Sequence, residues 1–256
     1  MVAKHRMNDV TAIVKTFERP GSLGRLIDSL RAFFPNLKIL VADDSSKPYP
    51  RNDVEYHILP YDVGVSTGRN YLLKKVQTKY AALFDDDHVC TKHTRIDRMV
   101  EIMERNPLDL VAGDFINYGR HRSCYHGLLQ IDGSACHVFI GKNRGQINGF
   151  PLFDITNNFF VARTEKLREV LWDEEIKFAR EHADFFLRCR NKLNITYSPN
   201  FSVNHFPGEK RYMGERGQQC IERFNSKWGV KARIVIGIPP TPWQRFKNAV
   251  SLPGQI

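Results

Sequence analysis

Short apolar runs and longer amphipathic segments alternate along most of the chain. The short runs, of which residues 10–14 are mostly β-branched, predict strands at residues 10–14, 37–42, 54–59, 79–84 and 108–112, and two more near Ile195 and Ser202. Apolar residues at helical spacing predict helices at residues 22–34, 71–76, 96–103, 164–171 and 180–190. This alternation is typical of a doubly wound, mainly parallel α/β sheet, in which ligands bind beyond the carboxyl ends of the strands.

Residues 115–153 break this alternation. They are rich in Gly, His, Arg and aromatic residues and have no long period, which predicts irregular hairpins and loops. No linker-like composition separates two domains. We therefore expect a single domain over residues 1–208, with an α/β half at about 9–114 and an irregular half at about 115–208, followed by a basic segment at 209–256.

Three consecutive aspartates, Asp85, Asp86 and Asp87, close the apolar run at 80–84. Adjacent carboxylates repel one another and are costly to desolvate unless a cation or strong donors lie among them. In an extended strand Asp85 and Asp87 point to one face and Asp86 to the other. This DxD pattern of hard oxygen ligands suits Mn²⁺ or Mg²⁺ that holds a diphosphate. A solvated acidic turn is the alternative, and the buried strand before it favours the metal.

Composition places the chain among ordinary globular proteins. It has 256 residues, of which 42% are hydrophobic and 26% charged. No apolar run approaches the roughly 20 residues that span a bilayer, and the polar N-terminal stretch is unlike a signal peptide. The five cysteines are odd in number and scattered, which favours a reducing compartment over a disulfide framework. We therefore expect a cytoplasmic protein. Cys124, His126, Cys136 and His137 lack the spacing of common structural zinc sites.

The net charge of +10 is concentrated towards the C-terminus, where residues 206–256 hold nine basic and three acidic residues. A basic surface attracts nucleic acid, anionic lipid or phosphorylated substrates alike. Within this region the tail interleaves aromatic and basic side chains at Trp243, Arg245, Phe246 and Lys247. This pattern predicts either peripheral attachment to the inner face of a membrane or packing of the tail against its own domain.

Several motifs taken together resemble known enzymes. The segments VKTFER at 14–19, VADDS at 41–45, GRN at 68–70 and FDDD at 84–87 resemble a GT-A glycosyltransferase that uses nucleotide sugars. The segments NPLDLVAG at 106–113, NFFVART at 158–164, HADFFL at 182–187 and VNH at 203–205 resemble the β-1,4-N-acetylgalactosaminyltransferase family that includes GM2/GD2 ganglioside synthase. The resemblance covers about residues 9–206, in order and at similar spacing. Animal members carry an N-terminal membrane anchor that this sequence does not show, which suggests a bacterial or viral relative or an excised domain.

The resemblance implies a Rossmann-like GT-A fold with a nucleotide-binding half, an acceptor half and a basic lid. Asp43 or Asp44 would hold uridine through its carboxylate, with an Asx turn as the alternative. Thr16, Phe17 and Glu18 would line the same pocket. Arg69 and Asn70 follow a glycine at a predicted helix start, where they would suit a diphosphate or ribose. The alternative is that Arg69 is an ordinary surface residue and Asn70 a helix cap.

For the metal, the family pattern favours Asp87 as the inner ligand and gives Asp85 a ribose or water-mediated role beside Asp86. His205 resembles the late histidine that completes the metal site in several GT-A enzymes, although a lone His is usually not a ligand. The metal would stabilise the departing UDP. The basic residues Lys210 and Arg211, just after His205, are expected to close over the phosphates.

Inversion by direct displacement also needs a base for the acceptor hydroxyl. Asp184 is the favoured candidate, because the ganglioside synthases share its His-x-acid pattern. Glu181 and His182 stay open as alternatives, since in other GT-A families the base falls in a Glu-Asp pair at these two positions. The alternative is that the acidic residues at the start of this helix only stabilise the helix dipole. The expected sugar-binding residues are Trp172, Asp173, Asn157 and Asn158.

The expected activity is thus metal-dependent transfer of a sugar, with GalNAc favoured, from UDP to a hydroxyl of a glycolipid or surface polysaccharide. Galactose, glucose and GlcNAc are alternative donor sugars. A basic nucleic-acid-binding protein would explain the charge but not the aspartates. A dinucleotide oxidoreductase would need a G-x-G-x-x-G motif after the first strand, which residues 18–24 do not supply.

Overall fold

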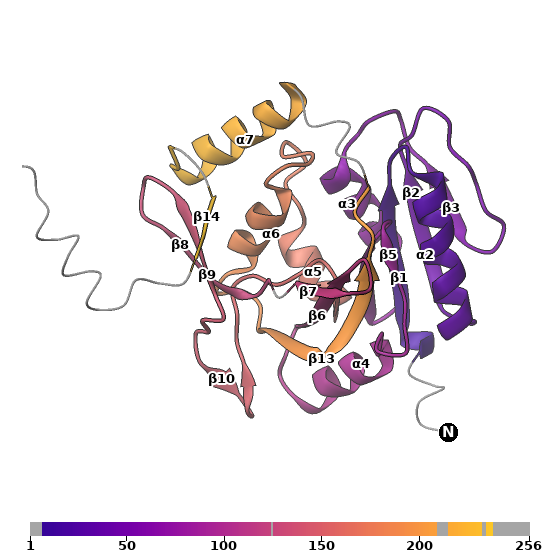
Figure 1. Ribbon diagram of the computed structural model, residues 1–256, viewed down its shortest axis with the longest axis horizontal. Helices are drawn as coiled ribbons and strands as arrows, with labels where there is room; N and C mark the ends of the chain where they lie inside the picture. The colour runs from indigo at the N-terminus through magenta and orange to yellow at the C-terminus, as the bar shows by residue number, and fades with distance from the viewer. Residues whose placement is uncertain (1–6, 124, 209–214, 232–233, 238–256) are drawn as a thin grey trace, which may run out of the picture.

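The computed structural model describes residues 7–123, 125–208, 215–231 and 234–237. Its core is a twisted nine-stranded sheet with helices on both faces (Figure 1). The strand order along the sheet is β3-β2-β1-β4-β12-β6-β13-β5, with β7 paired to β6. The strands span β1 Val10–Thr16, β2 Lys38–Asp43, β3 Glu55–Ile58, β4 Tyr80–Asp85, β5 His88–Val89, β6 Leu110–Asn117, β7 His121–Ser123, β12 Phe160–Arg163 and β13 Ile195–His205.

The sheet is mostly parallel, as the sequence pattern predicts, because β1 pairs in parallel with both β2 and β4 and β6 pairs in parallel with β13. Two strands of this sheet outside the region of predicted hairpins, β5 and β12, were not predicted. β12 lies antiparallel between β4 and β6 and joins the two halves of the sheet. The two strands predicted near Ile195 and Ser202 form one strand, β13, whose register shifts between Tyr197 and Ser202.

Alternate residues of the central strands build two separate cores. Ile13 and Leu83 face one core, whereas Val14 and Phe84 face the other, which is the two-residue period of a sheet buried on both sides. One face packs against α2 (Pro20–Phe33) and α4 (Ile96–Arg105), and the other against α3 (Val65–Lys75), α5 (Thr164–Val170) and α6 (Glu181–Cys189). A 3₁₀ turn, η1 (Met7–Asp9), precedes β1.

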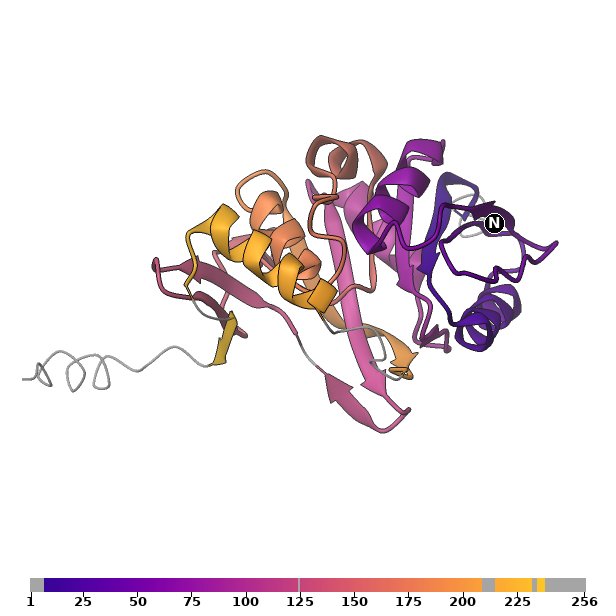
Figure 2. The ribbon, with the colours of Figure 1, turned by 90° about the horizontal axis from the view of Figure 1, so that it is seen from above.

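Residues expected to be irregular form a second, smaller sheet. β8 (Gly127–Ile131) and β9 (Cys136–Ile140) make a hairpin, and β14 (Ile234–Gly237) adds to β9 in parallel. A short hairpin of β10 (Gln146–Ile147) and β11 (Phe150–Pro151) follows. Helix α7 (Glu215–Trp228) lies against α6 in both ribbon views (Figures 1 and 2), and its Phe224 is fully buried. Part of the segment assigned to lid and tail therefore belongs to the folded body.

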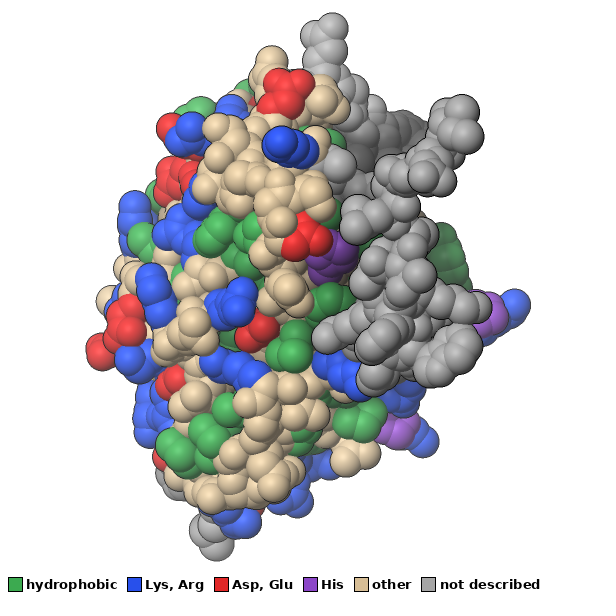
Figure 3. Space-filling view, turned by 90° about the vertical axis from the view of Figure 1, so that its left-hand side faces the viewer, with side chains coloured by type: hydrophobic (Ala, Val, Ile, Leu, Met, Phe, Trp, Pro, Cys, Tyr) green, Lys and Arg blue, Asp and Glu red, His purple; other side chains and the backbone are tan. Residues whose placement is uncertain are grey.

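No helix among the described residues is long and apolar enough to cross a membrane. On the face drawn in Figure 3, the Lys and Arg side chains of described residues are scattered among acidic and hydrophobic ones rather than gathered in one stripe. The carboxyl ends of β1, β2 and β4 lie side by side, and the residues with the predicted chemistry follow these ends.

Candidate active site

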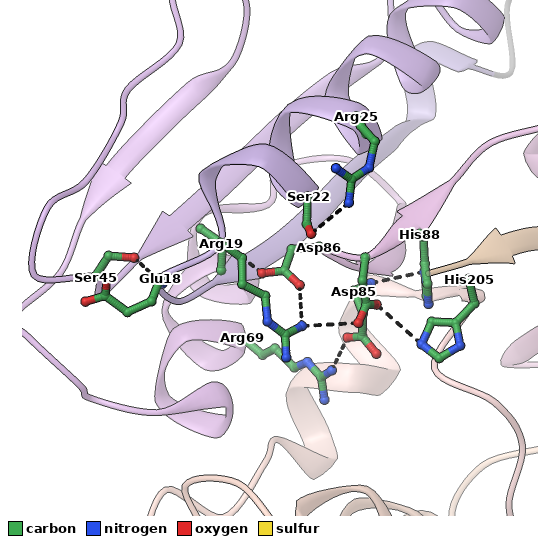
Figure 4. A network of polar contacts seen from close by, with 12 residues as sticks. Glu18, Arg19, Ser22, Arg25, Ser45, Arg69, Asp85, Asp86, His88 and His205 are labelled. Atoms are coloured by element: carbon green, nitrogen blue, oxygen red, sulfur yellow. Dashed lines mark hydrogen bonds and ion pairs between the residues drawn. The ribbon is translucent and has the colours of Figure 1, made fainter. Parts of the chain in front are cut away.

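The three aspartates at the end of β4 have three different sets of partners, and Figure 4 shows Asp85 and Asp86 with theirs. Asp85 forms an ion pair with Arg69 of α3. Asp86 accepts hydrogen bonds from the Thr16 hydroxyl at 2.7 Å and from Arg19 Nη1 at 3.0 Å. Arg19 Nη1 also lies 3.1 Å from Asp87 Oδ2. Two arginines therefore neutralise part of the charge that the sequence gathers here.

His205 lies beside Asp87 because the end of β13 pairs with β5. His205 stands opposite His88 in the antiparallel register, and the Phe206 amide donates to the Asp87 carbonyl at 2.9 Å. His205 Nε2 is 3.6 Å from Asp87 Oδ1, while Nδ1 is 2.7 Å from Asn117 Oδ1. Because the Asn117 oxygen only accepts, His205 carries its proton on Nδ1, and the Nε2 lone pair faces Asp87.

The environments of Asp86 and Asp87 shift their pKa values in opposite directions. Burial raises the pKa of Asp86 to about 6, although Arg19 opposes this shift. Burial also works against ionisation of Asp87, but His205 and His88 in their protonated forms, together with Arg19, outweigh it and lower the pKa of Asp87. Asp87 is therefore the carboxylate kept ionised at neutral pH.

The residues around Asp87 fit a divalent metal. Asp87 Oδ1 is buried and has no hydrogen-bond partner among the described residues, because 3.6 Å is too long for a hydrogen bond to His205. A carboxylate oxygen and an imidazole nitrogen are suitable ligands for Mn²⁺. Within the described part of the chain no set of three His, Cys, Asp or Glu side chains forms a metal-binding group. The protein would supply two ligands and leave the other positions for substrate oxygens and water.

The two aspartates after β2 are largely committed to the protein itself. Asp44 is fully buried, pairs with Lys15 and accepts from the Gly64 amide at 2.9 Å. Asp43 accepts from the Ser45 amide at 2.8 Å, which is the Asx-type turn considered as an alternative, and from the Tyr56 hydroxyl. Asp43 is 3% exposed and Asp44 is not exposed at all, so Asp43 is the one that retains contact with solvent.

The backbone just after β1 turns sharply beside Asp43 and Asp44. Glu18 adopts a left-handed φ of +55°, and its amide donates to the Ser45 hydroxyl at 2.6 Å. The Phe17 ring lies 5.6 Å from the Tyr61 ring, and Lys15 Nζ lies 5.1 Å from the Phe17 ring centre. These contacts place an aromatic pair next to Asp43 and Asp44, where a flat base could pack.

Arg69 and Asn70 lie in the second turn of α3, which begins at Val65, rather than at a helix start as the sequence predicted, and they serve different purposes. The Arg69 side chain is 3% exposed and lies 5.5 Å above the Trp172 ring, and its Nε and Nη1 atoms have no hydrogen-bond partner among the described residues. Asn70 instead uses its whole amide within the protein, since it accepts from the Trp172 amide and donates to the Trp172 carbonyl and Glu174, each at 2.9 Å. Arg69 is thus available to a ligand, whereas Asn70 holds the 172–174 loop.

The predicted sugar-binding residues divide in the same way. Asn157 donates to the carbonyls of Gly113 and Ser123 at 3.2 and 3.1 Å and so ties β12 to the β6–β7 hairpin. Asn158 is 8% exposed, and its side-chain amide makes no hydrogen bond with another described residue. Trp172 is buried and stacks on Phe185 at 4.2 Å. Asp173 pairs with Lys227 at 2.6 Å. Asn158 is therefore the most available of the four.

The first turn of α6 carries the three base candidates. Asp184 is 1% exposed and bonds to Lys227 at 2.7 Å and to Trp228 at 2.8 Å, so its carboxylate faces α7. Glu181 has no hydrogen bond or ion pair with a side chain of a described residue. Burial raises its pKa, against the opposing effects of Arg69 and the amides at the helix start.

His182 lies close to the same charges. Its Nε2 donates to the Thr156 carbonyl at 2.7 Å, which leaves the Nδ1 lone pair free. Burial lowers the pKa of His182 to about 4, so the ring is neutral at pH 7. Arg69 and Asp85 act electrostatically on both Glu181 and His182. Both side chains therefore lie within electrostatic range of Arg69 and Asp85.

Three contributors to this site were absent from the predicted set: Lys15, Arg19 and Asn117. Lys15 and Arg19 flank the predicted residues 16–18, so their position at the end of β1 was a usable signal. No signal in the sequence pointed to Asn117, because only the pairing of β6 with β13 brings it next to His205. Lys210, Arg211 and the tail residues Trp243, Arg245, Phe246 and Lys247 lie outside the described residues.

Comparison with known proteins gives the same fold and relates the chain to sugar transfer. Human β-1,4 N-acetylgalactosaminyltransferase 1 is 36% identical over 206 residues, which are 77% of this chain and 38% of that protein. Mouse β-1,4 N-acetylgalactosaminyltransferase 2 is 35% identical over 204 residues, 77% of this chain and 39% of that protein. The chain thus spans less than two fifths of the length of these relatives.

Solved structures and a family model complete the comparison. The crystal structure of S. aureus TarS 1-349 superposes with a TM-score of 0.56 at 16% identity and covers 85% of this chain and 72% of that one. Its complex with UDP-GlcNAc gives a TM-score of 0.58 at 15% identity over 80% and 60% of the two chains. The model of Glycosyl transferase family 2 matches residues 11–171. The chain therefore has the expected GT-A fold and belongs to glycosyl transferase family 2.

Proposed function

We propose that this chain is an inverting, metal-dependent glycosyltransferase that moves GalNAc from UDP-GalNAc to a hydroxyl of a glycan acceptor. The observation that carries the proposal is the pair of free ligand atoms, Asp87 Oδ1 and His205 Nε2, at the carboxyl end of the sheet. A glycosyltransferase of this fold needs its diphosphate anchored at that edge. The same edge carries the buried arginine Arg69, which has unused donors.

The donor nucleotide would lie along the carboxyl ends of the parallel strands, from Asp43 to Asp87. Asp43 and the Phe17–Tyr61 pair would receive the uridine, while Arg69 and Asp85 would lie near the ribose and phosphates. Asp87 and His205 would hold Mn²⁺ or Mg²⁺, which stabilises the negative charge of the departing UDP. Asp44 and Asn70 act as supports in this arrangement, because their polar atoms already bond within the protein. Asp86 likewise accepts from Thr16 and Arg19 and supports the pocket wall.

Glu181 is the base in this proposal. Its raised pKa makes it a stronger proton acceptor than His182, whose pKa is about 4, and Arg69 and Asp85 lie within electrostatic range of it. The sequence pattern favoured Asp184, but that carboxylate is buried against α7 and paired with Lys227. Asp184 therefore receives no direct catalytic role here.

The reaction is a single displacement. Glu181 takes the proton of the acceptor hydroxyl as its oxygen forms a bond to C1 of the sugar, and the C1–O bond to UDP breaks with both electrons on the phosphate oxygen. In this proposal Asn158 and Arg69 would orient the donor sugar, because the exposure of Asn158 and the unpartnered nitrogens of Arg69 leave them polar atoms to use. Attack opposite an α-linked UDP gives the β linkage that the names of the curated relatives contain.

The proposal also specifies which sugar the donor carries. GalNAc is favoured by the relatives that are about one third identical. UDP-GlcNAc is the strongest alternative, because the structurally similar TarS binds it, and UDP-galactose and UDP-glucose are further alternatives. The acceptor is proposed to be a glycolipid or a surface polysaccharide. Association with the inner face of a membrane through the tail remains a prediction, and no nucleic-acid partner is proposed.

A donor panel tests the function directly. Release of UDP from UDP-GalNAc, UDP-GlcNAc, UDP-galactose and UDP-glucose is measured with Mn²⁺, with Mg²⁺ and with excess EDTA. We expect release from UDP-GalNAc to exceed the other rates and to stop in EDTA. Preference for another sugar would change the donor assignment, and metal-independent release would overturn the mechanism.

A further inference from the structure

Asp184 is a buried carboxylate for which the proposed reaction has no use. Its Oδ1 atom receives the Lys227 ammonium at 2.7 Å and the Trp228 indole N–H at 2.8 Å, and its Oδ2 atom is buried without a partner among the described residues. A buried carboxylate that loses its cation is strongly destabilised. Asp184 is therefore an anchor that fixes α7 on α6.

Lys227 extends this anchor to a second element. Its Nζ atom also lies 2.6 Å from Asp173 Oδ2, in the loop that follows α5. One ammonium thus bridges two carboxylates from different segments, and both carboxylates are more buried than Lys227 itself. Without the bridge the two like charges would repel each other.

Both bridged segments form walls of the candidate sugar site. On one side, Asp173 follows Trp172, whose backbone is clamped by Asn70 and whose ring lies beneath Arg69. On the other side, Asp184 lies three residues after Glu181, in the first turn of α6. The distance between the Trp172 loop and Glu181 is therefore set partly by Lys227.

We propose that Lys227 is a positioning residue that holds the first turn of α6, and with it Glu181, against the Trp172 loop. The inference rests on the proposed function, because it assigns Lys227 to the orientation of the proposed base. Lys227 would act on the chemical step and leave nucleotide binding unchanged, since neither α6 nor α7 carries a residue proposed to bind UDP. Those residues lie at the ends of β1, β2, β4 and β13 and, for Arg69, in α3. A shift of the base by about 1 Å is enough to slow such a step by about 100-fold.

The test compares Lys227→Met with Lys227→Arg and a matched control, Arg223→Ala. Arg223 lies one turn earlier on α7 and pairs with Glu175 of the same loop, but this pair is exposed and does not include α6. We expect Lys227→Met to lower kcat at least about tenfold while the KM for the UDP-sugar and the Kd for UDP change by less than about twofold. Lys227→Arg should recover most of kcat, and Arg223→Ala should match the wild type.

A second measurement separates the positioning role from the proposed activity. Amide hydrogen exchange at residues 181–184, with UDP and Mn²⁺ present, should be faster in Lys227→Met than in the wild type. If the wild type transfers no sugar from any donor, the proposed function fails, and the exchange result still decides whether Lys227 holds α6.

Two outcomes would overturn the positioning role. One is wild-type kcat in Lys227→Met; the other is unchanged exchange at residues 181–184. If Lys227→Met does not fold, Lys227→Gln replaces it, because a glutamine amide can still donate to one carboxylate. The same two measurements then apply.

Discussion

His205 presents Nε2 to Asp87 Oδ1 across 3.6 Å because Asn117 accepts the proton of the opposite ring nitrogen. This separation is too long for a hydrogen bond and falls within the span of two atoms that share one ion at about 2.1 Å each. Backbone pairing of β13 with β5 fixes the ring next to the triple aspartate. The geometry gives each of the three residues a separate, testable role.

Removal of the Asp87 carboxylate should abolish metal-dependent turnover. We expect Asp87→Ala to lower UDP release at least about 100-fold, because the metal loses its charged ligand and the leaving UDP loses its stabilisation. Release is assayed with saturating Mn²⁺, and Asp97→Ala, in a surface pair with Arg95, is the control. Full activity of the wild type in excess EDTA would contradict this role for Asp87.

Asn117 should tune the metal site without contacting the metal. In Asn117→Ala, His205 loses the acceptor that holds its proton on Nδ1, and we expect Mn²⁺-supported UDP affinity to fall about 10- to 100-fold. Titration calorimetry with UDP, with and without Mn²⁺, measures the effect. An Asn117→Ala protein that binds UDP as tightly as the wild type would show that Asn117 does not orient His205.

The proposed base predicts the acidic limb of the pH profile. Glu181 must be ionised to accept a proton, so turnover should fall as the pH falls through its pKa, which burial raises above the ordinary 4.5. Glu181→Gln should lose at least about 100-fold in kcat and keep its UDP affinity. The discriminating result is a limb near pH 4 together with inactive His182→Gln and active Glu181→Gln, which would assign the base to His182.

The tail prediction tests membrane association. Trp243, Arg245, Phe246 and Lys247 should bind anionic vesicles, since aromatic burial and about 1 kcal/mol of attraction per basic residue act together. Deletion of the chain after Pro240 should abolish co-sedimentation with phosphatidylserine vesicles and leave UDP affinity unchanged. Loss of UDP binding in the truncated protein would instead make the tail part of the fold.

The amino-acid sequence was sufficient to predict the elements whose signals are local. The apolar runs of β1, β2 and β4 and the amphipathic pattern of α2 and α4 depend only on nearby residues, and they are confirmed. The triple aspartate at the end of β4 was also visible, because a strand followed by charge marks the edge where ligands bind. β12 was not predicted, since a strand of four residues is too short to show an alternating pattern that separates it from the helix that follows.

The tertiary structure decided which polar residues remain available to a ligand. Asp43 and Asp44 look equivalent in sequence, yet Asp44 is fully buried against Lys15 and the Gly64 amide, whereas Asp43 keeps a small exposed surface beside its bonds to Ser45 and Tyr56. Asp184 matched a family pattern, yet the packing of α7 makes it an anchor. Hydrogen-bond partners come from segments distant in sequence, so their identity is fixed only when strand pairing and helix packing bring those segments together.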